Sequence, residues 1–92
     1  MIRGFKSKGL EELWLNGRSA RIDSRLGDRI RRRLDRLNEV ERVQQMNLPG
    51  FDFRSLRGFD PTRYSVHVNG PWCITFTFDD GDAGEVDLEQ YH

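Results

Sequence analysis

The stretch that decides the fold is DSRLGDRIRRRLDRLNEV, residues 23–40. Apolar residues recur along it at spacings of four, four and three: Leu26, Ile30, Leu34 and Leu37. This is the stripe of an amphipathic helix, so we predict a helix over residues 24–40. Asp23 or Ser24 is the expected N-cap. The arginines off the stripe indicate a solvated face partly paired with acids.

Upstream, residues 1–6 are predicted to form a short strand. Residues 8–16 are predicted to form a helix that ends at Gly17. Downstream, residues 41–46 are expected to add a helical turn or two before Asn47-Leu48-Pro49-Gly50 stops the helical pattern.

After residue 50 the pattern becomes β. The predicted strands are residues 53–57, 64–68, 72–78 and 83–88. Asn69-Gly70 is a strong hairpin signal, and the acidic segment 79–82 is the next turn. Helices followed by consecutive antiparallel strands indicate an α+β domain over residues 1–92, with the helices packed on one face of the sheet.

Cysteine usage and hydropathy point to the cytoplasm. Cys73 is the single cysteine among 92 residues, so an internal disulfide is excluded, which fits a reducing compartment. No apolar run approaches the roughly 20 residues of a membrane span. We therefore expect a cytoplasmic protein without a membrane partner.

The net charge is zero, but the charges are unevenly distributed. All 15 Lys and Arg lie in residues 1–63, and residues 64–92 hold acids alone. Such asymmetry suggests an anionic partner for the first part, and arginine suits phosphate. A GC-rich genome would produce the same excess of arginine without any such partner.

The sequence lacks the usual motifs of cofactor or metal chemistry, and we expect neither group. His67 sits between two valines, which favours a surface or hydrogen-bonded sheet histidine over a catalyst. Candidate functional residues are Arg54, Arg57 and Arg63 beside the first strands of the meander, and the terminal pair Tyr91-His92. Arg54 and Arg57 would lie on opposite faces of a regular strand unless a bulge or a strand end intervenes.

Several segments, taken in order, resemble the HigB-type toxins of the RelE-like superfamily. They are MIRGFKSKGL (1–10), Glu12-Leu13, MNLPG (46–50), LRG (56–58), YSV (64–66), NGPW (69–72), ITF (74–76), GDA (81–83) and Tyr91-His92. The resemblance covers essentially the whole chain. It implies a RelE-like fold, neutralisation by a HigA-type helix-turn-helix antitoxin, operator DNA contact only through that antitoxin, and cleavage of mRNA in the A site of the 30S ribosomal subunit.

The chemistry implied by the resemblance is metal-independent attack of the ribose 2′-OH on the adjacent phosphate. Arg57 matches a basic position of the family and would stabilise charge. Tyr91 and His92 match its C-terminal pair and would assist proton transfer and base stacking. Arg63 is a further candidate RNA contact.

Three positions depart from the family pattern. Arg54 stands where His is frequent, and a guanidinium binds phosphate but is a poor general base. Cys73 replaces an arginine that would face the scissile phosphate, and Gln90 replaces an acid; both are candidate substrate-contacting positions.

Three hypotheses follow. The first is an active ribosome-dependent endoribonuclease, and the second is an attenuated toxin that mainly binds its antitoxin and co-regulates the operator. The third is an RNA- or ribosome-binding domain without an antitoxin.

Overall fold

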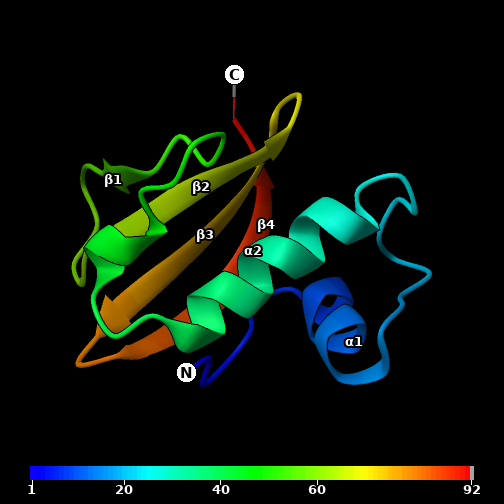
Figure 1. Ribbon diagram of the computed structural model, residues 1–92, viewed down its shortest axis with the longest axis horizontal. Coiled ribbons are helices and arrows are strands. Elements are labelled where there is room, and N and C mark those ends of the chain that lie inside the picture. Colours follow the sequence, from blue (N-terminus) through cyan, green and yellow to red (C-terminus); the bar gives the residue numbers. More distant parts are fainter. Residues whose placement is uncertain (92) are drawn as a thin grey trace.

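The computed structural model describes residues 1–91, in which two helices cover one face of a four-stranded antiparallel sheet (Figure 1). In chain order the elements are α1 (Lys8–Asn16), α2 (Gly27–Glu39), the 3-10 turn η1 (Val43–Met46), β1 (Arg54–Leu56), β2 (Arg63–Asn69), β3 (Trp72–Asp79) and β4 (Asp82–Gln90). The predicted α+β class and the placement of the helices on one face are confirmed.

Helix α1 begins and ends as its sequence predicts. The Ser7 hydroxyl accepts a hydrogen bond from the Leu10 N–H at 3.1 Å, which satisfies one of the free donors of the first turn. Gly17 follows the last turn with φ of 81°, a left-handed conformation that glycine adopts without strain, and its N–H donates to the Leu13 carbonyl.

Helix α2 starts later than predicted, and neither Asp23 nor Ser24 is its N-cap. Leu26 holds that position without a side-chain hydrogen bond. The Asp23 carboxylate instead accepts the Arg25 N–H at 2.9 Å and pairs with the Arg25 guanidinium at 2.8 Å. Asp23 therefore stabilises a separate turn before the helix begins. The predicted start of the helix at residue 24 was wrong.

The four strands form a meander in the order β1-β2-β3-β4. The predicted hairpin at Asn69-Gly70 joins β2 to β3, and Gly70 has φ of 57° there. The acidic turn joins β3 to β4, with Asp80 at φ 49° and Gly81 at φ 83°. Both turns use the left-handed backbone that tight hairpins require.

The first six residues do not form the predicted strand. They lie beside β4 and make two isolated parallel bridges, Ile2 to Ala83 and Phe5 to Val86. Between these bridges Glu85 has a left-handed backbone with φ of 45°, where the register between β3 and β4 also shifts. This bulge in β4 lies between the two bridges, so the segment and β4 do not form a continuous ladder.

The core lies between the helices and the inner face of the sheet. The helices contribute residues of the predicted stripe, and alternate residues of the strands face them. Its fully buried apolar side chains include Leu10, Ile30, Leu34, Leu37, Val66, Ile74, Phe76 and Val86. None of the helices described within residues 1–91 is long and apolar enough to cross a membrane.

Candidate functional site

The face of the sheet opposite the helices carries polar side chains. Strand alternation places Ser65 and His67 of β2 on this open face, since Val66 between them is in the core. In the β2–β3 register, His67 is paired with Cys73 and Ser65 with Thr75. The open face therefore carries polar side chains from neighbouring strands, of which Ser65 and Thr75 are buried and His67 and Cys73 are partly exposed.

A hollow of about 310 Å³ lies on this face. Its lining combines the segment before β1, three strands and the end of the chain: Asp52, Arg54, Leu56, Ser65, His67, Gly70, Cys73 and Tyr91. The Tyr91 N–H donates to the Pro71 carbonyl at 2.7 Å. This bond holds Tyr91 against the β2–β3 hairpin, so that its side chain completes the lining of the hollow.

Arg54 supplies the positive charge in the lining of the hollow. Its guanidinium pairs with the Asp52 carboxylate through two contacts, of 3.1 Å and 3.3 Å. Both side chains are more than half exposed, at 68% and 60%. An exposed pair of this kind contributes little to stability. The pair uses Nε and Nη2, so the guanidinium can keep Asp52 and still donate to a phosphate through its other N–H groups.

Arg63 lies beneath the surface and is 7% exposed. Its Nη2 donates to the Thr75 hydroxyl at 3.0 Å and to the Glu85 carbonyl at 2.9 Å. Thr75 in turn donates to the Glu89 carboxylate at 2.5 Å, and the Tyr91 hydroxyl donates to the same carboxylate oxygen at 3.5 Å. A chain of polar contacts thus connects the buried arginine to the tyrosine of the hollow.

The two weak acids of the hollow are both held in their protonated forms. Burial raises the pKa of the Cys73 thiol, and the carboxylates of Asp52 and Glu89 add to the effect while Arg54 opposes it. Burial also raises the pKa of the Tyr91 phenol, with Glu89 again adding to it. At neutral pH both groups are therefore proton donors rather than bases.

The structure brings together only some of the predicted site residues. Arg54, Cys73 and Tyr91 line the hollow, and Arg63 supports it from below. Arg57 is exposed in the turn that follows β1, outside the lining. Gln90 is exposed and pairs with Trp72 in the register. His92 lies outside the described residues.

Several polar residues of this region were not among the predicted candidates, Asp52 and Ser65 among them, and two of them bear most on its chemistry. His67 lines the hollow, and Glu89 receives the contacts from Thr75 and Tyr91. The signal for His67 was present, because the Asn-Gly hairpin and period-two alternation place it on the same face as Cys73. Glu89 gave no comparable signal, because its neighbours depend on the bulge in β4.

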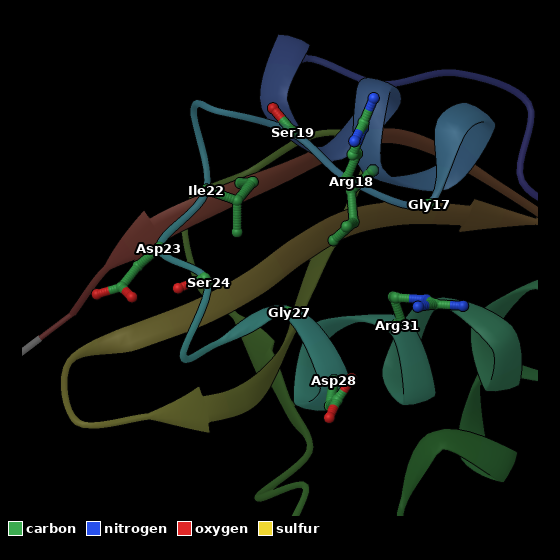
Figure 2. A pocket seen from close by; sticks show the side chains of 10 residues that line it. Gly17, Arg18, Ser19, Ile22, Asp23, Ser24, Gly27, Asp28 and Arg31 are labelled. Atoms are coloured by element: carbon green, nitrogen blue, oxygen red, sulfur yellow. The ribbon is translucent and has the colours of Figure 1, made fainter.

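A second hollow, of about 210 Å³, lies between the α1–α2 connection and the start of α2 (Figure 2). Its charged side chains include Arg18, Asp23, Asp28 and Arg31, and Figure 2 shows them spread in different directions rather than converging. None of the predicted site residues lines it. Within residues 1–91, no group of three His, Cys, Asp or Glu side chains is arranged to hold a metal ion.

The sequence of the chain is similar to that of known proteins. Residues 3–92 match the family described as the RelE-like toxin of the type II toxin-antitoxin system HigB. The chain belongs to this family. An endoribonuclease HigB from Proteus vulgaris is 33% identical to it over 92 residues, which span the whole of both chains.

Membership in the HigB family confirms the resemblance drawn from the sequence segments. It also accounts for the two-layer fold, which is consistent with a RelE-like toxin. A toxin of a type II system has an antitoxin as its partner. Family membership therefore counts against the hypothesis of an RNA-binding domain without an antitoxin.

Proposed function

We propose that this HigB-family toxin is a ribosome-dependent endoribonuclease that cuts mRNA in the A site of the 30S subunit. The observation that carries the proposal is the hollow on the open face, where Arg54, Cys73 and Tyr91 meet from distant parts of the chain. The full-length similarity to a protein named endoribonuclease HigB supports the same reaction class.

The proposed reaction is an internal transesterification that uses no metal. The 2′-oxygen of the ribose forms a bond to the adjacent phosphorus and the bond to the 5′-oxygen breaks, which leaves a 2′,3′-cyclic phosphate and a 5′-hydroxyl. Such a reaction needs a base for the 2′-OH, cations for the phosphorane and a donor for the leaving oxygen.

The side chains of the hollow suit two of these needs. Arg54 offers a fixed positive charge, and Arg57 can add a second from the turn beyond β1. The protonated phenol of Tyr91 suits donation to the leaving 5′-oxygen, and its ring can stack on a base. We assign a share of the proton transfer to His92, while Arg63, Cys73 and Gln90 support or contact the substrate.

The proposal includes the partners implied by this activity. A HigA-type helix-turn-helix antitoxin neutralises the protein and provides its only contact with operator DNA. The ribosome and mRNA are the targets, which places the toxin in the cytoplasm. The concentration of all 15 Lys and Arg in residues 1–63 supports binding to a polyanionic surface such as ribosomal RNA.

The test adds the purified protein to ribosomes programmed with a defined mRNA and maps the new 5′ ends by primer extension. We expect cuts inside the A-site codon, which disappear when the nucleotide before the cut carries 2′-deoxyribose. The His92→Ala variant is expected to cut at least tenfold more slowly. Intact mRNA, from folded protein that still binds ribosomes, would overturn the proposal and favour an attenuated toxin that mainly binds its antitoxin.

A further inference from the structure

His67 occupies a central place in the hollow. It faces Cys73 directly across the β2–β3 pair. Arg54 is paired with Ser65, two residues before His67 on the same face, so Arg54 lies diagonally across from the imidazole. The ring is partly exposed, and a substrate entering the hollow would meet it.

One hydrogen bond fixes which ring nitrogen carries the proton. Nε2 of His67 lies 3.0 Å from the carbonyl oxygen of Gly70. A carbonyl oxygen only accepts, so Nε2 must carry the hydrogen and donate it. In the neutral ring the lone pair is then on Nδ1, and no hydrogen-bond partner for Nδ1 is seen among residues 1–91. The hydrogen bond to the hairpin carbonyl therefore leaves Nδ1 as the ring nitrogen that can accept a proton.

The backbone of His67 is held on both sides. Its N–H donates to the Phe51 carbonyl at 2.6 Å, and its carbonyl accepts from Nε of Arg33 at 2.6 Å. Arg33 is 9% exposed and lies over the Phe51 ring, 4.6 Å from its centroid. The register shifts between His67 and Asn69, and such bulges re-aim side chains. The imidazole is therefore placed before a substrate binds, as a catalytic group requires.

The other groups of the described hollow are poor bases. Cys73 and Tyr91 have raised pKa values and stay protonated at neutral pH. Arg54 keeps its proton, and Asp52 is engaged by the Arg54 guanidinium. With its hydrogen on Nε2, the imidazole of His67 keeps a lone pair on Nδ1, and a nitrogen of this kind can serve as a general base.

We propose that His67 is the general base of the nuclease reaction, an assignment that rests on the proposed function. Nδ1 takes the proton of the ribose 2′-OH while the 2′-oxygen forms its bond to phosphorus. The bond from phosphorus to the 5′-oxygen breaks, and that oxygen takes a proton from an acid such as the Tyr91 phenol. The Gly70 carbonyl stabilises the imidazolium that results, because Nε2 still donates to it.

The test compares single-turnover cleavage by the parent protein, His67→Gln and His67→Ala on programmed ribosomes at saturating concentration. The Gln amide can still donate to the Gly70 carbonyl but is not a base, so it separates proton transfer from structural support. Loss of a general base typically lowers the rate by about 10²–10⁴, and we expect a fall in this range for His67→Gln. Added imidazole should restore part of the rate of His67→Ala and leave the parent unchanged.

A second measurement is independent of cleavage. The ¹⁵N chemical shifts of the His67 ring in the free protein should identify the neutral tautomer with hydrogen on Nε2. Two outcomes would overturn the role of His67 and leave the proposed function standing. One is cleavage by His67→Gln at the parent rate, and the other is a neutral ring with its hydrogen on Nδ1. A parent protein that leaves mRNA intact would overturn this assignment together with the proposed function.

Discussion

Cys73 is paired with His67 on one side and with Glu89 on the other in the registers of β3. It therefore occupies the centre of the polar face, yet it contributes neither charge nor a strong hydrogen bond. The raised pKa of its thiol reinforces this neutrality. A cation at this position would face any phosphate that enters the hollow, next to Arg54.

Replacing Cys73 with arginine is expected to accelerate cleavage. Removing one hydrogen-bond donor to the charge that develops in a transition state typically lowers the rate by on the order of 10²–10³. An arginine at position 73 would add a contact of this kind to the phosphorane, so we expect the rate to rise by up to about 10²-fold. The measurement is single-turnover cleavage on programmed ribosomes. Cys73→Gln is the matched control, since glutamine is long and polar but uncharged. A gain as large with glutamine would contradict the charge argument.

Residue patterns together with the family resemblance predicted some site positions and missed others. Arg54, Cys73 and Tyr91 were predicted candidates and line the hollow. Arg63 was predicted to contact RNA, but its guanidinium is buried against the Thr75 hydroxyl and the Glu85 carbonyl. Which arginine reaches solvent depends on how neighbouring strands pair, and strand pairing is a long-range property that no local pattern contains.

Among the elements, those with strong periodicity were predicted best. In α2, several apolar residues recur about once per helical turn, and in β3 they recur at every second position. Each pattern rests on several residues, because burial of one face selects apolar side chains along the whole element. The N-terminal segment had too few residues for such a pattern, and its two bridges depend on the bulge at Glu85. The start of α2 was misplaced because Asp23 caps the preceding turn.

The turn before α2 should contribute to stability in a pH-dependent way. The hydrogen bond and charge of Arg25 lower the pKa of the Asp23 carboxyl from 3.8 to about 2 in the folded protein. A group with a lowered folded pKa stabilises the fold above its unfolded pKa and loses that contribution as the pH falls through the folded value. The stabilisation should therefore be complete above about pH 5 and fade between pH 4 and pH 2.

Asp23→Asn tests this expectation, since its amide oxygen can still accept the Arg25 N–H. Urea unfolding midpoints of the parent and the variant should differ most at pH 6 and converge as the pH falls toward 2. Arg18→Gln, in the same connection, has no ion pair among residues 1–91 and should differ from the parent by a pH-independent amount. A constant difference for Asp23→Asn would contradict the lowered pKa.

In the whole molecule, helices and sheet share a single core. Side chains from α1 and α2 pack directly on β2, β3 and β4, and no second cluster of buried apolar residues is present within residues 1–91. The helices also hold the site, because Arg33 of α2 donates to the backbone of His67 from the far side of the sheet. Loss of either layer would therefore disrupt both the core and the hollow.

Unfolding should accordingly be a single cooperative transition. Trp14 lies in the helical layer and Trp72 in the sheet, and both pack against the core. In urea, the fluorescence of Trp14→Phe and of Trp72→Phe, each retaining one tryptophan, should give transitions that match the far-UV circular dichroism of the same variant. A fluorescence transition displaced from the dichroism transition of the same variant would show that one layer unfolds before the other.

The attachment of residues 1–6 to β4 has a consequence for the order of folding. The Arg3 N–H donates to the Ala83 carbonyl and the Val86 N–H to the Gly4 carbonyl, so these bonds join segments from opposite ends of the described chain. Contacts between residues so distant in sequence form more slowly than the local hairpins of the meander, because a long loop must close first. Residues 1–6 should therefore dock late in folding, after β3 and β4 have paired.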